Sequence, residues 1–178
     1  MLKRIGTSGL RKRIWDREFG EGRWLQGEDP KRTKAGDIIE KYLPKGGTLL
    51  DLGCSDGVIA CTQRGMGQYI GVDVSEVAIQ SARRREFDHS FRWVCSDMSK
   101  FKPDVKIDVI FFGYSLYYLG RFEIRKTLDR YRQWLSELGV IIVVMDNPKR
   151  HRWITNLILR HYNVLEYMAA NPVVVVFR

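Results

Sequence analysis

Short segments made almost wholly of apolar residues alternate along the chain with segments whose apolar residues lie three or four positions apart. Such apolar runs are typical of strands buried on both faces, and the wider spacing is typical of amphipathic helices. Strands are predicted at 48–52, 68–72, 91–95, 107–112, 139–145, 164–167 and 173–177. Helices are predicted at 31–42, 58–64, 121–137 and 153–162, with another behind a capping serine at Ser75. This order predicts an α/β fold with a mostly parallel sheet and helices on both faces.

The last two predicted strands are separated by only a few residues around Asn171 and Pro172. A parallel crossover needs roughly a dozen residues or more, so a link this short permits only an antiparallel hairpin. No internal repeat, low-complexity tract or second domain interrupts the pattern. We therefore expect residues 1–178 to form a single domain, with residues 31–178 as its α/β core.

Residues 1–30 are polar and aromatic, unlike the segments that follow them. Trp15, Phe19 and Trp24 stand among charged side chains. We expect residues 10–28 to form a lid that covers a bound ligand and contacts a substrate. The alternative is that this segment only docks a terminal helix onto the sheet.

The composition limits the classes of protein that this chain can be. Its 178 residues, of which 44% are hydrophobic and 29% charged, suit one domain with a packed core. No apolar run approaches the roughly 20 residues that cross a bilayer, and the residues after Met1 lack the apolar centre of a signal peptide. Cys54, Cys61 and Cys95 are too few and too widely spaced for a disulfide framework or a zinc site. We expect a cytoplasmic protein with reduced thiols and no bound metal.

The net charge of +9 favours an anionic partner without identifying it. The cations are spread over several short runs, at 11–13, 83–85, 125–126 and 149–152. RNA, an acidic lipid surface and a phosphorylated metabolite all stay open. So does the simpler interpretation, in which each run is a solvated helix face.

The segment that carries candidate chemistry is Leu49-Leu50-Asp51-Leu52-Gly53-Cys54-Ser55-Asp56-Gly57, followed at the end of the next strand by Asp73. Small residues at a strand-to-helix turn let a ligand approach the backbone closely, and amide groups at a helix start favour a carboxylate or phosphate. An acidic side chain about 20 residues further on can accept both hydrogen bonds of a ribose diol. An ordinary tight turn would explain the glycines alone. Their combination with Asp51 and Asp73 predicts a nucleoside site at the carboxyl ends of the strands.

The run Asp-Leu-Gly-Cys-Ser-Asp-Gly at 51–57 resembles the first motif of the class I S-adenosylmethionine-dependent methyltransferases, usually Asp/Glu-x-Gly-x-Gly-x-Gly. The resemblance extends from about residue 31 to the end of the chain and includes the closing hairpin. It implies a Rossmann-like sheet with strand order 3-2-1-4-5-7-6 and strand 7 antiparallel. It also implies S-adenosylmethionine as cofactor, released as S-adenosylhomocysteine. Ser55 stands where the family has its middle glycine, and the dehydrogenase pattern Gly-x-Gly-x-x-Gly is absent.

The resemblance also assigns residues to parts of the cofactor. The residues implied around its methionine part are Asp51, Gly53, Cys54, Ser55 and Gly57. Asp73 would hold the ribose hydroxyls, and Val74 would lie beside the adenine. Asp97 and Met98 match the segment where the family places an acidic side chain against the adenine amino group. Gly113 and the residues after it match the segment that lines the cofactor and substrate pocket.

A shorter resemblance follows the fourth strand. Leu116-Tyr117-Tyr118-Leu119, with Asp108-Val109-Ile110 before it, is similar to the nodulation-type N-methyltransferases and related small-molecule enzymes, some of which act on sugars. The alternative is that the two tyrosines only pack against a helix cap. The Asp/Asn-Pro-Pro-Tyr motif, typical of enzymes that methylate exocyclic base amines, is missing after this strand.

Methyl transfer from a sulfonium is an in-line displacement, so the protein mainly supplies proximity and alignment. An amine acceptor needs only to arrive unprotonated, whereas a hydroxyl acceptor usually needs a general base. His151 follows the fifth strand and is the candidate base, with a solvated surface histidine as the alternative. Tyr114, Tyr117 and Tyr118 could orient an acceptor, although an unperturbed phenol is a poor base near neutral pH.

Lys149, Arg150 and Arg152 also follow the fifth strand, where they could pair with a phosphate or carboxylate. We therefore expect methyl transfer to a nitrogen or oxygen of a small polar or anionic metabolite, such as a sugar derivative. Two alternatives stay open. The basic charge balance favours an RNA methyltransferase, and the small size favours a non-catalytic cofactor-binding partner subunit.

Overall fold

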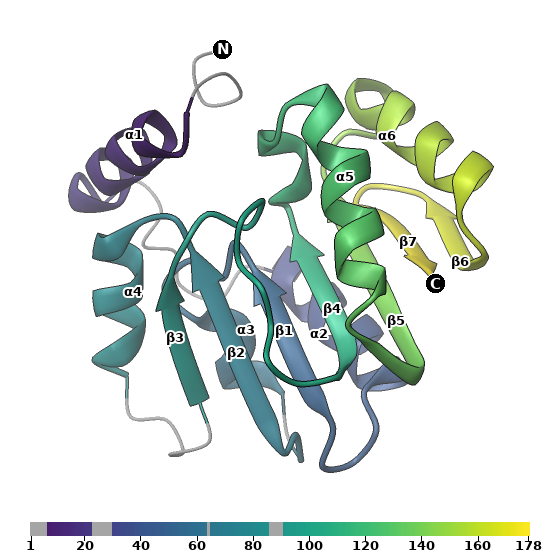
Figure 1. Ribbon diagram of the computed structural model, residues 1–178, viewed down its shortest axis with the longest axis horizontal. Coiled ribbons are helices and arrows are strands. Elements are labelled where there is room, and N and C mark those ends of the chain that lie inside the picture. Colours follow the sequence, from purple (N-terminus) through teal and green to yellow (C-terminus); the bar gives the residue numbers. More distant parts are fainter. Residues whose placement is uncertain (1–6, 23–29, 64, 86–90) are drawn as a thin grey trace.

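The computed structural model describes residues 7–22, 30–63, 65–85 and 91–178. One sheet runs through the molecule in the order β3-β2-β1-β4-β5-β7-β6, with helices on both faces (Figure 1). The strands are β1 (Thr48–Leu52), β2 (Gln68–Asp73), β3 (Phe91–Cys95), β4 (Ile107–Gly113), β5 (Leu135–Met145), β6 (Val164–Ala169) and β7 (Val173–Phe177). The helices are α1 (Ser8–Gly20), α2 (Pro30–Tyr42), α3 (Val58–Thr62), α4 (Glu76–Arg83), α5 (Arg121–Arg132) and α6 (Pro148–His161), with a 3-10 turn η2 (Leu116–Tyr118). This architecture confirms the predicted Rossmann-like fold.

The strand directions bring the loops of the candidate site to one edge of the sheet. β1 lies between β2 and β4 and is parallel to both, and the pairs β2–β3 and β4–β5 are also parallel. β7 is antiparallel to β6, as the short link between them predicts, and antiparallel to β5, as the family resemblance implies. The carboxyl ends of β1 to β5 therefore share one edge, and the loops after them can build a single site.

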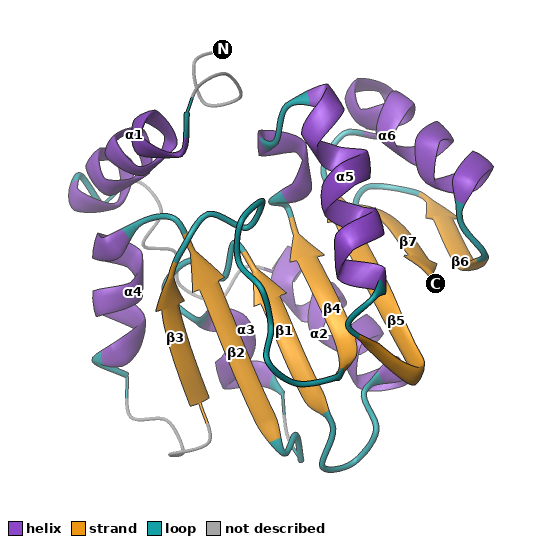
Figure 2. Cartoon of the chain, in the orientation of Figure 1, coloured by secondary structure: helices purple, strands orange, loops and turns teal. Residues whose placement is uncertain are grey.

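Two hydrophobic cores cover the two faces of the sheet. Successive side chains of a strand point to opposite faces, so Leu50 packs with residues of α5 and α6 while Leu49 packs with residues of α2 and α3. In Figure 2, α2 and α3 lie behind the sheet and α5 and α6 in front of it. Because both faces are covered, β1 and β4 are buried at nearly every position. This double burial explains why both strands read as continuous apolar runs.

The boundary between the fifth helix and the fifth strand differs from the prediction. The helix predicted to residue 137 ends at Arg132, and β5 begins at Leu135 instead of at residue 139. Leu135 continues the helical spacing of the apolar residues before it, but in the structure it pairs with Ile107 in the sheet. The register then shifts, and the next pair joins Val109 to Val140. Tertiary pairing thus outweighs a local pattern that fits helix and strand equally well.

The sixth helix begins five residues earlier than predicted, at Pro148 instead of residue 153. Asn147 caps it, because its side-chain oxygen accepts a hydrogen bond from the amide of Arg150 at 3.1 Å. Proline at the first helical position needs no hydrogen-bond acceptor for its nitrogen. The Asn-Pro pair was therefore a helix-start signal, which the apolar spacing alone did not contain.

Helix α1 lies at the carboxyl ends of the strands, next to α4 (Figure 1). The Ser75 hydroxyl donates to Asp16 of α1 at 2.8 Å and accepts from the amide of Ala78 at 3.3 Å, so the predicted cap of α4 also joins the two helices. A carboxylate is stabilised at a helix N-terminus by the helix dipole. Trp24 and the rest of the expected lid from 23 to 28 lie outside the described residues.

Replacing Gly139 with alanine is expected to destabilise the fold. The new Cβ would lie 2.7 Å from the carbonyl oxygen of Ile107, close to the register shift between β4 and β5. Overpacking of this kind costs about 1–3 kcal/mol of unfolding free energy, which urea denaturation measures. The matched control is Gly9→Ala in α1, where nothing lies within 4 Å of the new Cβ. A Gly139→Ala variant as stable as the control would contradict the close approach.

Candidate active site

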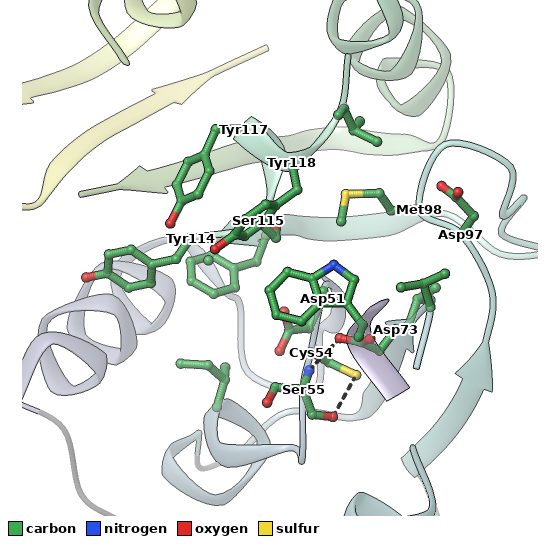
Figure 3. A pocket seen from close by; sticks show the side chains of 18 of the residues that line it. Asp51, Cys54, Ser55, Asp73, Asp97, Met98, Tyr114, Ser115, Tyr117 and Tyr118 are labelled. Atoms are coloured by element: carbon green, nitrogen blue, oxygen red, sulfur yellow. Dashed lines mark hydrogen bonds between the residues drawn. The ribbon is translucent and has the colours of Figure 1, made fainter. Parts of the chain in front are cut away.

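A cavity of about 320 Å³ lies at the carboxyl ends of β1 to β5. Its walls come from the turns after these strands and from α1, which contributes Arg11, Trp15 and Phe19. Figure 3 shows Tyr114, Tyr117 and Tyr118 grouped on one side of the cavity, away from Asp97. The predicted site residues that line it are Asp51, Gly53, Cys54, Ser55, Asp73, Val74, Asp97, Met98, Gly113, Tyr114 and Tyr118. The structure thus brings together predicted residues from four separate turns, those at the ends of β1, β2, β3 and β4.

The turn after β1 has a tightly specified backbone. Gly53, Ser55 and Gly57 all have positive φ, at 85°, 57° and 81°. A Cβ on Gly53 would lie 2.5 Å from the Cβ of Ser115, so only glycine fits between the turns after β1 and β4. Ser55 occupies the left-handed region that glycine adopts without cost. This conformation gives the physical reason why the family has a glycine at that position.

The amide groups of this turn bond within the protein. Gly53 and Cys54 donate to the carbonyl of Val72 at 2.7 and 3.1 Å, and Gly57 donates to the carbonyl of Cys54 at 3.1 Å. The sequence predicts that these amides face a ligand. In the structure, α3 is a single short turn, and the amides donate to carbonyl groups of the protein instead. A Cβ on Gly57 would lie 2.5 Å from the ring of Trp93. Gly57 therefore packs against β3 and lies outside the cavity lining.

Asp73, at the end of β2, is held by two turns at once. Its Oδ2 accepts from the amide of Ser55 at 3.0 Å, and its Oδ1 accepts from the amide of Ser75 at 2.9 Å. Burial raises the pKa of Asp73 to about 6, although the amides of Ser75, Ser55 and Val74 oppose the shift. Each carboxylate oxygen can accept a second hydrogen bond. The arrangement suits two neighbouring hydroxyl donors.

Asp97, after β3, is fully occupied by protein donors. Its Oδ2 accepts from Nε and Nη2 of Arg11 at 3.1 and 2.7 Å, and its Oδ1 accepts from the amide and hydroxyl of Ser99, both at 2.8 Å. Burial would raise the pKa of Asp97, but the hydrogen bonds from Arg11 and Ser99 outweigh it and hold the pKa below its ordinary value. The buried Arg11 also donates to Glu123 at 3.1 Å. Asp97 thus binds α1 to the body of the fold.

Asp51 is the third carboxylate that the sequence predicts to lie near the cofactor. It lies within β1, is 2% exposed, and accepts from the hydroxyl of Tyr69 at 2.8 Å. Its position beside the turn after β1 agrees with the expectation that it would stand near the methionine part of a cofactor. That role stays a prediction.

The three tyrosines after β4 lie on the opposite side of the cavity. Tyr114 has a φ of 57°, and its amide donates to the carbonyl of Val144 in β5 at 2.9 Å. Ser115 donates to the carbonyl of Leu52 at 2.5 Å, which ties this turn to β1. Burial raises the pKa of Tyr117 far above its ordinary value, so its phenol stays neutral. These side chains can line and orient an acceptor.

His151 is buried, contrary to the solvated alternative, and it lies behind the cavity wall. Its ring stacks on Tyr117 with centroids 4.2 Å apart, and its Nε2 lies 2.9 Å from Oδ1 of Asp146. Asp146 lines the cavity, whereas His151 does not. Sequence reasoning missed Asp146, although its place directly after β5 was a usable signal. It also missed Arg11, because nothing local links a helix residue to a carboxylate 86 positions away.

The cations predicted to meet an anionic substrate stand elsewhere. Lys149, Arg150 and Arg152 are exposed on the first turns of α6 and are absent from the cavity lining. Cys54, Cys61 and Cys95 are unpaired in the structure. Within the described ranges, no group of three or more His, Cys, Asp and Glu side chains is placed to hold a metal ion. Among the helices that the structure describes, none has the length and apolar character needed to cross a membrane.

Comparison with curated proteins finds short matches. The ribosomal protein L11 methyltransferase of Thermotoga petrophila is 36% identical over 62 residues, which are 32% of this chain. The match spans only 24% of the length of that relative. The identity therefore covers part of the domain and leaves the substrate of this chain open.

Solved structures share the architecture over most of the chain. The N-methyltransferase NodS of Bradyrhizobium japonicum, in complex with S-adenosylhomocysteine, has a TM-score of 0.69 at 17% identity and covers 87% of this chain and 90% of its own. The 1,6-didemethyltoxoflavin-N1-methyltransferase of Burkholderia thailandensis has a TM-score of 0.77 at 14% identity, over 98% and 91% of the two chains. At these identities the similarity establishes the fold.

A family model described as a methyltransferase domain matches residues 49–139, just over half of the chain. The matched segment begins in β1 and runs through the turns that carry Gly53, Asp73 and Asp97 into β5. Together with the strand order β3-β2-β1-β4-β5-β7-β6, this match confirms the resemblance seen in the sequence. The chain belongs to the methyltransferase domain family and has the class I S-adenosylmethionine-dependent methyltransferase fold.

Proposed function

We propose that the chain binds S-adenosylmethionine in this cavity and transfers its methyl group to a nitrogen or oxygen of a small polar or anionic metabolite. The observation that carries the proposal is the Asp73 carboxylate, which two turns hold with one accepting position left on each oxygen. A ribose diol supplies the two donors that these positions suit. Gly53 has no side chain and lines the cavity, while Ser115 packs on the side where a Cβ would stand, so the cofactor can lie against the backbone of this turn.

S-adenosylmethionine supplies a methyl group on a sulfonium, which is already an activated leaving group. The residues of this chain therefore act by binding, orienting and excluding water. Asp73, Asp51 and the turn after β1 would fix the cofactor on the β1–β2 side. Tyr114 and Tyr118 would orient the acceptor from the turn after β4. His151, the base predicted from the sequence, lies behind the cavity wall, so it could act on an acceptor only through Asp146.

A lid made by α1 is part of this proposal. Arg11, Trp15 and Phe19 line the cavity from α1, and Arg11 fastens the helix to Asp97 and Glu123. A bound cofactor would lie beneath this helix, shielded from water. Asp97, predicted to meet the adenine amino group, has its four accepting positions occupied by Arg11 and Ser99. Its main contribution is therefore to keep the lid closed.

The small size of the acceptor is supported by the cavity volume of about 320 Å³, which cofactor and acceptor would share. The choice of nitrogen is supported by the similarity to structures whose names specify N-methyltransferases. The proposal that the acceptor is anionic depends on Lys149, Arg150 and Arg152, which are exposed and do not line the cavity. A cytoplasmic location stays a prediction from the sequence.

The exposed cations of α6 favour one alternative, an RNA methyltransferase. Retention of transfer RNA on a filter at low and high salt tests it, because phosphate contacts weaken steeply with salt.

A non-catalytic partner subunit is tested by asking whether the chain alone transfers radiolabelled methyl groups to any of a panel of small acceptors. Transfer to RNA with none to small acceptors would replace the proposal.

The affinity for S-adenosylhomocysteine is expected to rise with pH and to level off above about pH 6. The pKa of Asp73 is about 6 in the free chain, and ribose hydroxyls donate best to the ionised carboxylate, so binding releases a proton. Below that pKa the affinity should fall by up to about tenfold per pH unit. Calorimetry at pH 5 to 8 measures the profile.

Asp73→Asn should weaken binding at pH 7 by about tenfold or more, because a charge-assisted hydrogen bond is lost, and should flatten the profile. Asp104→Asn is the control, since Asp104 is exposed, lies in the loop between β3 and β4 and pairs with Arg92. A flat profile in the unmodified chain, or no binding of either sulfur nucleoside, would contradict the proposal.

Arg11→Ala is expected to speed the dissociation of S-adenosylhomocysteine. The change removes the bonds from α1 to Asp97 and Glu123 and leaves the buried Asp97 without its cationic partner. Breaking one side of a buried ion pair costs about 3–5 kcal/mol, enough to release the helix. Stopped-flow tryptophan fluorescence measures the dissociation rate, and Arg13→Ala, at an exposed position of the same helix, is the control. Equal rates in the two variants would show that α1 is no lid.

A further inference from the structure

The two ends of the cavity lie three strand spacings apart across the sheet. Asp73 ends β2 and Asp146 follows β5, and β1 and β4 lie between these strands. Neighbouring strands are about 4.8 Å apart, so the two carboxylates stand on the order of 14 Å from each other across the sheet. One ribose cannot reach both. If Asp73 holds the cofactor, then Asp146 belongs to the part of the cavity where an acceptor enters.

The charges that line this cavity are mostly negative. Among its described lining residues, the acidic side chains are Asp51, Asp73, Asp97 and Asp146, and the cationic side chain is Arg11. Arg11 is engaged by Asp97 and Glu123, so its charge is matched before any ligand binds. An anionic acceptor would therefore meet the Asp146 carboxylate at its end of the cavity, where the described lining offers no further cation to receive it. An acceptor that carries a positive charge would be attracted.

Aromatic rings lead from the lid to Asp146. Trp15 of α1 meets Tyr118 edge-on with ring centroids 4.9 Å apart, and Tyr118 contacts Tyr117 at 4.8 Å. Tyr117 stacks on His151, whose Nε2 contacts Asp146. Trp15, Tyr117 and Tyr118 all line the cavity. Aromatic faces bind planar groups and attract cations, so this wall and the carboxylate next to it favour the same kind of molecule.

We propose that the acceptor is a planar-ring amine that arrives as an ammonium ion, and that Asp146 binds this ion and takes its proton. The inference rests on the proposed methyl transfer and narrows its acceptor to the nitrogen of a cationic amine, in place of an anionic metabolite. One ammonium proton moves to Oδ2 of Asp146, the oxygen that does not contact His151, and this transfer frees the nitrogen lone pair. The lone pair then forms the bond to the methyl carbon while the carbon–sulfur bond breaks, and its electron pair stays on sulfur. The product is the methylated ammonium, and Asp146 returns its proton to solvent.

His151 acts as a positioning residue for Asp146. Opposite an ionised carboxylate, its Nε2 must carry the hydrogen, so it donates to Oδ1 and leaves Oδ2 for the acceptor. The ring is fully buried and stacked on Tyr117, which fixes the direction of this hydrogen bond. Almost half of the Asp146 side chain stays accessible, with 43% exposure against 1% for His151. The pair thus combines a hydrogen-bond donor fixed by burial, Nε2 of His151, with an accessible acceptor, Oδ2 of Asp146.

The test uses benzylamine, benzyl alcohol and benzoate, which share one ring and differ in charge. Each compound is titrated by NMR into the full chain saturated with S-adenosylhomocysteine, and each is incubated with radiolabelled S-adenosylmethionine. Benzylamine should bind at least about tenfold more tightly than benzoate, as a charge-assisted hydrogen bond allows, and should take up label. Tighter binding of benzoate, or label only in benzyl alcohol, would overturn the inference.

Three variants test whether the Asp146 carboxylate carries the preference for benzylamine. Asp146→Asn, which keeps the shape, should remove the preference and leave the affinity for S-adenosylhomocysteine unchanged. Asp104→Asn, the control carboxylate on the surface, should keep the preference. The double variant Arg150→Ala with Arg152→Ala should also keep it, whereas a loss of benzoate binding in that variant would favour an anionic acceptor instead.

His151→Gln retains an amide donor and should keep the benzylamine preference, whereas His151→Phe retains only the stacking ring and should lose it. Equal effects of the two changes would assign His151 a purely structural role and overturn its positioning of Asp146. If Asp146→Asn weakens S-adenosylhomocysteine binding as much as Asp73→Asn does, Asp146 holds the cofactor and the inference falls. If no sulfur nucleoside binds to the unmodified chain, the proposed function itself falls.

Discussion

The Asp73 carboxylate joins the two turns on which the rest of the cavity depends. It accepts the amide of Ser55 from the turn after β1 and the amide of Ser75 from the start of α4. A buried amide without a partner is costly, so both turns are held by one side chain. The same burial raises the pKa of Asp73 to about 6. Two hydroxyl donors from a ligand would satisfy the oxygens that the protein leaves half occupied.

Helix α1 depends on a second set of carboxylates. Arg11 is buried between Asp97 and Glu123, and Asp16 accepts from the serine that caps α4. These contacts place the helix beside the cavity, where Trp15 and Phe19 form part of its lining. A buried ion pair contributes little to stability by itself, but losing one partner is costly. The arrangement therefore fixes the position of the helix more than it stabilises the fold.

Much of the fold could be predicted from the sequence because the pattern of each element is local. Double burial produces the continuous apolar runs of β1 and β4, and the short link at Pro172 allows only a hairpin. The prediction failed at the end of α5, where Leu135 satisfies a helical spacing but pairs with Ile107. Local patterns do not contain the competing interaction, so they cannot decide such a boundary.

The sequence by itself determined the turn that follows β1 and the acidic residue at the end of β2. Spacing and residue size limit what those positions can do, and neither depends on distant contacts. Only the tertiary structure decided that Arg11 reaches Asp97, that His151 is buried, and that Asp146 faces the cavity. Each of these facts depends on how strands far apart in the chain are ordered in the sheet. That order is set by packing on both faces of the sheet, which no single segment encodes.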